Sequence, residues 1–225
     1  MVRAQLATKR CLDLLLAGAA LALWAIPLAC LMLAIRLGMG RPVLFRQLRP
    51  GKDEKLFAVY KLRTMIDACG ADGRPLPDAQ RLTPLGRFLR RTSLDELPQL
   101  WNVLCGDMSL VGPRPLLERY LPYYSDRERL RFAVRPGITG WAQVHGRNTV
   151  GWDERLALDG WYVENWSLAL DCRILWQTFL AVLTRRGVVA DPQSLGKDLD
   201  EARRDSSRHA PHAVRPHAAD RNTLA

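Results

Sequence analysis

The sequence predicts a mainly α-helical protein with a small β-hairpin, an α+β chain whose N-terminal end is held by a membrane. Residues 14–35 form a run of 22 residues without a charged side chain, which is long enough to cross a bilayer. Downstream, two short β-prone runs at 43–48 and 56–63 flank the turn-rich segment 49–55, which is the pattern of a hairpin. Most other apolar residues recur at helical spacing.

The apolar segment contains a proline and has cations at both ends. Pro27 lies slightly past its middle, where proline kinks or breaks a helix. Lys and Arg mark the cytoplasmic side of a membrane, and they flank this segment as Arg3, Lys9, Arg10, Arg36, Arg41, Arg46 and Arg49. We therefore expect a re-entrant helix that enters, bends at Pro27 and returns. The alternatives are a spanning helix and a buried helix of a soluble protein. Asp13 is expected to pair with Lys9 or Arg10.

The overall charge and the cysteines limit the classes of partner. The 225 residues carry a net charge of +10, which favours anionic partners such as anionic lipid, phosphorylated metabolites or nucleic acid. The five cysteines are widely spaced without a C-x-x-C pair, so neither a disulfide framework nor a zinc site is indicated and a reducing, cytosol-facing compartment fits best. Neither G-x-x-x-x-G-K-[ST] nor G-x-G-x-x-G occurs, which excludes the common nucleotide fingerprints.

The centre of the sequence is an acid pair at the start of a predicted helix. Ser93 and Glu96 form a capping-box pattern, apolar residues recur up to residue 104, and Gly106 is a candidate C-cap. Asp95 and Glu96 then lie in the first turn, where acids are common for electrostatic reasons alone. Basic residues nevertheless crowd around them in the sequence, at Arg87, Arg90, Arg91 and Arg114. This combination favours a site that holds an anionic substrate while a carboxylate attacks it.

Two neighbouring segments contribute to this site. Thr83 and Pro84 begin a predicted helix that carries three of the arginines, for which a solvated helix face is the alternative. The segment 112–115 (Gly-Pro-Arg-Pro) is a rigid turn that suits bidentate phosphate binding by Arg114, or else a plain turn. Between the hairpin and this helix, residues 67–78 are expected to form a surface loop.

The C-terminal half predicts three helices and a tail. Residues 120–134 are basic and aromatic, as in an amphipathic helix lying on an anionic membrane surface; an ordinary surface helix is the alternative. Residues 153–166 and 171–184 also have helical periodicity. After residue 189 large apolar side chains become rare, so residues 190–225 are expected to be disordered.

Several motifs, in the same order, resemble those of one family. They are Lys9-Arg10-Cys11-Leu12-Asp13, the proline-broken apolar segment, Tyr60-Lys61-Leu62-Arg63-Thr64-Met65, Thr92-Ser93-Leu94-Asp95-Glu96-Leu97-Pro98-Gln99, Gly106 to Pro115, Arg135-Pro136-Gly137-Ile138-Thr139-Gly140, and Glu164-Asn165-Trp166-Ser167 with Asp171. Over residues 8–188 the chain resembles the bacterial sugar transferases, small monotopic polyprenyl-phosphate phosphoglycosyl transferases. The resemblance implies a membrane-anchoring segment at residues 1–40 and a catalytic domain at residues 41–189, while the tail at residues 190–225 extends beyond the family core.

The resemblance also implies a reaction and residue roles. The family transfers a sugar-1-phosphate from a UDP-sugar to undecaprenyl phosphate with Mg²⁺, releases UMP and begins a surface glycan, at the cytoplasmic face of the inner membrane. By resemblance, Asp95 is the nucleophile, Glu96 binds Mg²⁺ or assists proton transfer, and Arg90 and Arg114 hold phosphate. The resemblance also places Asp171 at the metal and Arg147 at the nucleotide. The implied partners are the two substrates, membrane lipid and downstream glycosyltransferases of the same pathway, with no nucleic acid.

One departure and one alternative function accompany the resemblance. Short family members often have Ser-Pro at the break, whereas Ile26 precedes Pro27 here and offers no hydroxyl to a freed carbonyl. The alternative function is a non-enzymatic basic membrane adaptor, which the charge of +10 would suit. The adaptor predicts that Asp95→Asn leaves function intact, whereas the enzyme predicts near-total loss.

Overall fold

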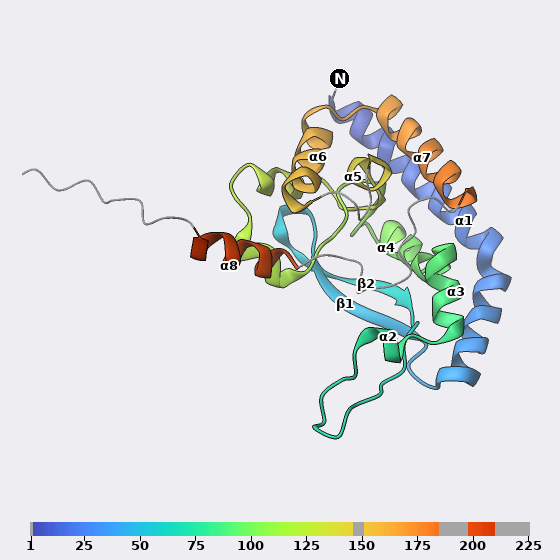
Figure 1. Ribbon diagram of the computed structural model, residues 1–225. Coiled ribbons are helices and arrows are strands. Elements are labelled where there is room, and N and C mark those ends of the chain that lie inside the picture. The colour runs from blue at the N-terminus through green and yellow to red at the C-terminus, as the bar shows by residue number, and fades with distance from the viewer. Residues whose placement is uncertain (1, 146–150, 185–197, 210–225) are drawn as a thin grey trace, which may run out of the picture.

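The computed structural model describes residues 2–145, 151–184 and 198–209. These residues are mainly helical and carry a hairpin and a short pair of parallel strands, in agreement with the predicted fold class. The long helix α1 (Val2–Met39) runs along one side of the molecule, and the shorter elements gather against it (Figure 1).

Helix α1 is long and apolar enough to cross a membrane, and most of its surface is not covered by the rest of the chain. Leu23, Ile26 and Leu37 are 77–79 % exposed. The helix continues through Pro27, so the expected break at that residue is wrong. Figure 1 shows instead that α1 bends along its length, as helices with an internal proline commonly do.

The predicted hairpin is confirmed. Strands β1 (Leu44–Pro50) and β2 (Leu56–Leu62) pair antiparallel, from Leu44 opposite Leu62 to Pro50 opposite Leu56, and the 3-10 turn η1 (Lys52–Glu54) joins them. Beyond β2 the chain forms the predicted surface loop, which projects from the end of the hairpin (Figure 1).

A series of short helices follows the hairpin: α2 (Asp78–Arg81), α3 (Pro84–Thr92), the 3-10 turn η2 (Leu94–Glu96) and α4 (Gln99–Cys105). Thr83 caps α3 as predicted, because its hydroxyl accepts the Gly86 N–H at 2.9 Å. Ser93 adopts the left-handed conformation with φ 57°, and its side chain caps no backbone N–H. A capping serine needs extended backbone, so the predicted capping box at Ser93 and Glu96 is wrong. The chain turns sharply at Ser93 instead, and α4 begins at Gln99.

Strands β3 (Ser109–Val111) and β4 (Gly137–Thr139) form a parallel pair. The backbones approach so closely beyond β3 that side chains do not fit. A Cβ on Gly137 would lie 2.1 Å from the backbone nitrogen of Gly112, and one on Gly112 would lie 2.4 Å from the Arg135 carbonyl oxygen. Glycine at these positions therefore fixes the course of the chain into the Gly-Pro-Arg-Pro turn.

The N-terminal end of α1 is bonded to β3. Asp13 is buried, and its carboxylate accepts the Ser109 hydroxyl at 2.8 Å and the Leu110 N–H at 3.0 Å. The expected ion pair of Asp13 with Lys9 or Arg10 is therefore wrong. This carboxylate of α1 is satisfied by neutral donors of a segment almost a hundred residues away in sequence, which local spacing does not reveal.

The C-terminal end of α1 is capped by a buried arginine of the segment after β2. The Arg63 guanidinium donates to the carbonyl oxygens of Met39 at 3.2 Å and Arg41 at 2.9 Å, which satisfies carbonyls that a helix end leaves without partners. Close to this end of the helix, Ile35 of α1 and Leu89 of α3 are fully buried together in one hydrophobic cluster. The second half of α1 thus packs on α3 and the hairpin.

Residues 120–134 do not form the predicted membrane-surface helix. They contribute to two 3-10 segments, η3 (Glu118–Tyr123) and η4 (Glu128–Ala133). Pro122 interrupts a regular helix, and the aromatic side chains Tyr120, Tyr124 and Phe132 are buried together. The aromatic residues of this segment therefore form core rather than a lipid-facing surface.

The remaining helices before the tail are α5 (Trp141–His145), α6 (Trp152–Glu164) and α7 (Leu168–Leu183). Helices α6 and α7 confirm the predictions at 153–166 and 171–184 within a few residues. Helix α7 exposes large apolar side chains at Trp176, Phe179 and Leu183.

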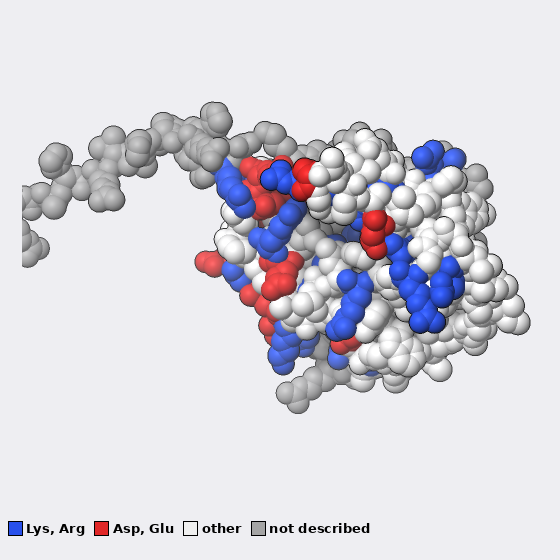
Figure 2. Space-filling model, turned by 90° about the horizontal axis from the view of Figure 1, so that it is seen from below, with Lys and Arg blue, Asp and Glu red and all other residues white. Residues whose placement is uncertain are grey.

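Part of the tail is folded. Residues 199–209 form α8 (Leu199–His209), so the prediction of disorder is wrong there; residues 190–197 and 210–225 lie outside the described residues. Leu199 is 0 % exposed in the cluster of Tyr120, Tyr124 and Phe132, and Arg203 pairs with Glu128 at 2.6 Å. Acidic and basic side chains interleave around α8 (Figure 2). Leu199 and the ion pairs of α8 thus dock a segment whose composition is otherwise typical of disorder.

Replacing Leu199 by alanine tests this docking. Because the side chain is fully buried, its loss should cost about 2–5 kcal/mol of unfolding free energy if α8 unfolds with the domain. The measurement is denaturant unfolding in detergent, compared with Glu201→Ala, which removes an exposed side chain of the same helix. Equal stability of the two variants would show that α8 is not held by Leu199.

Candidate active site

The acid pair lies on η2, at the sharp turn after α3. Asp95 is 9 % exposed, and within the described part of the chain its carboxylate makes no hydrogen bond or ion pair. A buried carboxylate is normally satisfied by donors. Asp95 is therefore a desolvated acceptor whose oxygens are available to a ligand.

Glu96, the next residue, is bound by two cations. Its Oε1 accepts Lys61 Nζ at 2.7 Å, and both of its oxygens accept the Arg114 guanidinium, with Oε2 at 3.2 Å from Nη1. Burial opposes ionisation of Glu96, but the charges and hydrogen bonds of Arg114 and Lys61 outweigh it and hold the pKa of Glu96 well below its usual range. Glu96 is a fixed anion that organises the cations around Asp95.

The two acids differ in their protonation. Burial, and then the adjacent negative charge of Glu96, raise the pKa of Asp95 to about 6, against the smaller opposing effects of Lys61, Arg114 and Arg90. A carboxylate with this pKa is ionised at pH 7, yet it is poorly solvated and more basic than an ordinary aspartate. These are properties of a nucleophile or a base rather than of a structural acid.

Each cation is held in place by a separate buried contact. Asn102 on α4 fixes β2, since its amide donates to the Ala58 carbonyl at 2.7 Å and accepts the Tyr60 N–H at 3.2 Å; this places Lys61 at Glu96. The Arg114 carbonyl accepts a hydrogen bond from Arg131.

Arg131 is itself fixed from the opposite side. It pairs with Asp159 at 3.0 Å and donates to the Tyr124 hydroxyl at 3.0 Å, and both charged residues are almost fully buried. Burial raises the pKa of Asp159 to about 6 in spite of Arg131 and Arg155. The Arg114 turn therefore rests on a buried ion pair of η4 and α6.

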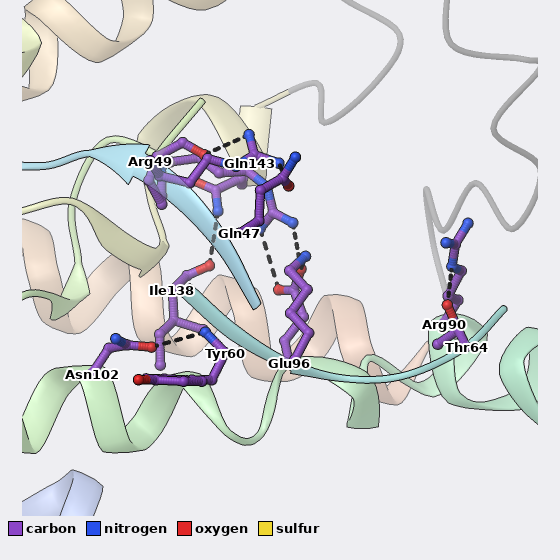
Figure 3. A network of polar contacts seen from close by, with 12 residues as sticks. Gln47, Arg49, Tyr60, Thr64, Arg90, Glu96, Asn102, Ile138 and Gln143 are labelled. Atoms are coloured by element: carbon purple, nitrogen blue, oxygen red, sulfur yellow. Dashed lines mark hydrogen bonds and ion pairs between the residues drawn. The ribbon is translucent and has the colours of Figure 1, made fainter. Parts of the chain in front are cut away.

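Two further arginines complete the positive field. Arg90 donates to the Thr64 hydroxyl at 3.1 Å, and its charge lowers the pKa of Asp95. Arg49 on β1 donates to Gln47 Oε1 at 2.6 Å; burial and the charge of Arg114 lower its pKa to about 10. Figure 3 shows Glu96 between the Gln47 and Arg49 side chains on one side and the contact of Arg90 with Thr64 on the other.

The structure brings together Asp95, Glu96, Arg90 and Arg114, but not every residue that the sequence indicated. Arg147 lies outside the described residues. Sequence reasoning gave no role to Lys61 or Arg49. Lys61 belongs to one of the family-like motifs and could have been found there, whereas Arg49 reads only as a charge flanking the apolar segment.

Asp171 belongs to a different network, at the start of α7. It accepts Lys9 Nζ at 2.6 Å, the Tyr162 hydroxyl at 2.7 Å and Trp166 Nε1 at 3.1 Å. Among the described residues no contact joins it to Asp95 or Glu96. Lys9 also donates to the Val111 carbonyl at 3.0 Å. Asp171 therefore locks α1 to α7 and β3, and the structure does not support the metal role predicted for it.

The acid pair fits a magnesium ion of the kind that is shared with a substrate. Mg²⁺ is commonly held by one or two carboxylates together with substrate phosphates, and no larger cluster of acidic, His or Cys side chains occurs among the residues described. Asp95 has no bonded donor, and Glu96 Oε2 accepts a single long hydrogen bond, so both carboxylates keep acceptor capacity.

The sequence matches the family model described as "Bacterial sugar transferase" over residues 4–185. The chain belongs to this family. The matched range ends before α8, so the docked tail helix lies outside the part that defines the family.

Named relatives agree with this membership. An uncharacterized sugar transferase of Bacillus subtilis is 54% identical over 154 residues, which are 68% of this chain and 76% of that protein. A UDP-glucose:undecaprenyl-phosphate glucose-1-phosphate transferase of Caulobacter vibrioides is 45% identical over 188 residues, 78% of this chain and 70% of that protein. An undecaprenyl-phosphate galactose phosphotransferase of Salmonella typhimurium is 43% identical over 167 residues, 66% of this chain but only 35% of that protein.

Proposed function

We propose that the chain transfers a sugar-1-phosphate from a UDP-sugar to undecaprenyl phosphate and thereby begins an exopolysaccharide or a related surface glycan. The observation that carries the proposal is Asp95: a buried, unbonded carboxylate with a raised pKa, surrounded by the cations that Glu96 organises. The names of the relatives support the two substrate classes. They include both glucose and galactose transferases, so the donor panel has to contain several sugars.

In the first step, an Asp95 oxygen attacks the sugar-bearing phosphorus of the UDP-sugar. The new bond joins this oxygen to phosphorus, the bond from phosphorus to the bridging oxygen breaks, and UMP leaves with that oxygen. Asp95 needs no proton transfer at pH 7, because it is already ionised. Arg90 and Arg114 hold the phosphate oxygens and offset the charge that builds up between two anions.

In the second step, a phosphate oxygen of the lipid attacks the same phosphorus and breaks the bond to Asp95. The products are the lipid-diphosphate sugar and the free carboxylate. Glu96 and Asp95 would hold Mg²⁺, which supplies further neutralisation of the phosphate charge. Glu96 meanwhile keeps Lys61 and Arg114 in place through both steps.

The arrangement of α1 supports a site at the membrane surface. Its exposed apolar side chains enter the lipid of the bacterial inner membrane, while Lys9 and Arg63 bond its two ends to the domain that holds the site. With both ends of α1 on this domain, the proposed topology is re-entrant and the site faces the cytoplasm.

The test is to trap the intermediate. Protein in nanodiscs is incubated with Mg²⁺ and a panel of UDP-sugars without the lipid, and peptide masses are measured. We expect a phosphosugar adduct on Asp95 together with a stoichiometric amount of UMP, and continued UMP release once undecaprenyl phosphate is added. Release of UMP only in the presence of the lipid, without an adduct, would indicate direct transfer, and the absence of both across the panel would refute the proposal.

A further inference from the structure

Helix α3 presents a hollow of about 260 Å³ on its outer face, lined by Pro84, Arg87, Phe88, Arg91 and Thr92. These residues follow the spacing of a helix stripe that normally faces a core. Here the stripe faces outward, and Phe88 is 51 % exposed. The opposite face of α3 carries Leu89, which is buried against α1.

The two arginines of this groove have no partner among the described residues. Neither Arg87 nor Arg91 makes a hydrogen bond or an ion pair there. The Thr92 hydroxyl is already engaged, because it donates to the backbone carbonyls of its own helix, with Phe88 at 2.8 Å. The groove thus offers two unpaired guanidinium groups beside an apolar floor.

This lining matches an anion attached to a hydrocarbon. Two guanidinium groups bind phosphate oxygens well, and the Phe88 ring and Pro84 cover apolar chain. A nucleotide sugar would expose hydroxyl and base groups to a floor that has nothing free to bond them. On the face shown in Figure 2, basic side chains outnumber acidic ones on the side of α2 and α3, unlike the mixed surface around α8.

The position of the groove connects the membrane with the nucleophile. Helix α3 packs on the second half of α1, where Leu33 and Leu37 are exposed. The same helix carries Arg90, one position from Arg91, and the charge of Arg90 acts on Asp95. A phosphate bound at Arg87 and Arg91 lies on the helix face next to the one that serves the site.

We infer that this groove is the docking site of the lipid acceptor, with the undecaprenyl phosphate headgroup on Arg87 and Arg91 and the first part of its chain on Phe88 before the phosphate moves to the phosphorus on Asp95. The inference rests on the proposed function and adds to it a site for the second substrate, separate from the phosphate contacts of Arg90 and Arg114.

The experiment uses Arg87→Gln/Arg91→Gln in the full chain in nanodiscs. We expect the KM for undecaprenyl phosphate to rise about ten- to a hundredfold, while the rate of adduct formation on Asp95 from the UDP-sugar alone stays within about twofold. Phe88→Ala should raise the same KM. The matched control is Lys52→Gln/Lys55→Gln, which removes two exposed cations at the hairpin turn and should leave the KM unchanged.

Three results would overturn the inference. The first is an unchanged KM for the acceptor in Arg87→Gln/Arg91→Gln, and the second is a loss of adduct formation in this variant as large as its loss of transfer to the lipid. The third is suppression of the wild-type reaction by excess phosphatidylglycerol in the nanodisc, which would indicate a general site for anionic lipid. A wild-type protein that forms neither adduct nor UMP would instead refute the proposed function.

Discussion

Replacing Asp95 by asparagine is expected to lower the rate of transfer by roughly three orders of magnitude or more. The amide has the same shape but no charge, so it cannot form the bond to phosphorus. The measurement is UMP release with a UDP-sugar and undecaprenyl phosphate, together with the mass of the peptide that contains residue 95. Asp95→Glu serves as the matched variant: it keeps the charge but moves the oxygens, and should retain measurable activity.

The same substitution should not unfold the protein. Burial and Glu96 raise the pKa of Asp95 from 3.8 to about 6, so the folded protein holds this proton more tightly than the unfolded chain. As the pH rises from about 4 to about 6, ionisation of Asp95 lowers the stability, and this loss is complete at neutral pH. Asp95→Asn removes the cost, so its Tm at pH 7 should equal or exceed that of the wild type. Retained activity in a folded Asp95→Asn protein would favour the basic adaptor.

Local sequence patterns predicted the hairpin, α3, α6 and α7, because periodicity and caps determine such elements over a few residues. The acid pair and its arginines could also be predicted, because they lie close together in the sequence, between Arg87 and Arg114. Local patterns did not predict the long-range contacts that bring these groups together. Asn102 fixes Lys61, and Arg131 fixes Arg114, through contacts with residues far apart in the chain.

The wrong predictions share a physical cause, which is that tertiary contacts replaced the local partner. Asp13 has cations three and four residues before it, yet its oxygens bond to β3. Ser93 has a glutamate three residues later, yet the turn that buries Asp95 requires a left-handed backbone at Ser93. The aromatic residues near Tyr124 were assigned to a membrane surface, but the core around Leu199 uses them.

The membrane helix is also more closely connected to the site than its composition indicates. Asp13 and Lys9 bond to β3, and β3 leads directly into the turn of Arg114. Helix α1 therefore acts as part of the scaffold that positions Arg114, in addition to being long and apolar enough to cross a membrane.

Replacing Glu96 by glutamine is expected to lower the rate of adduct formation by about 10²–10³-fold, an effect typical of the loss of one preorganised electrostatic group. The variant leaves Lys61 and Arg114 without their shared anion, so both cations lose the geometry that presents them to a phosphate. The measurement is the rate of adduct formation under single-turnover conditions, with Glu201→Gln as a control that removes an exposed acid on α8.

The pH dependence separates this role from a merely structural one. In the wild type, kcat/KM for the UDP-sugar should fall below pH about 6, because protonated Asp95 cannot attack. Glu96 raises the pKa of Asp95, while Lys61 and Arg114 lower it. Glu96→Gln removes the charge that raises the pKa of Asp95, so the acid limb should move to lower pH even though the maximal rate is reduced. An acid limb that stays near pH 6 in Glu96→Gln would show that the charge of Glu96 does not control the nucleophile, and a limb that moves to higher pH would contradict the arrangement of charges described for this site.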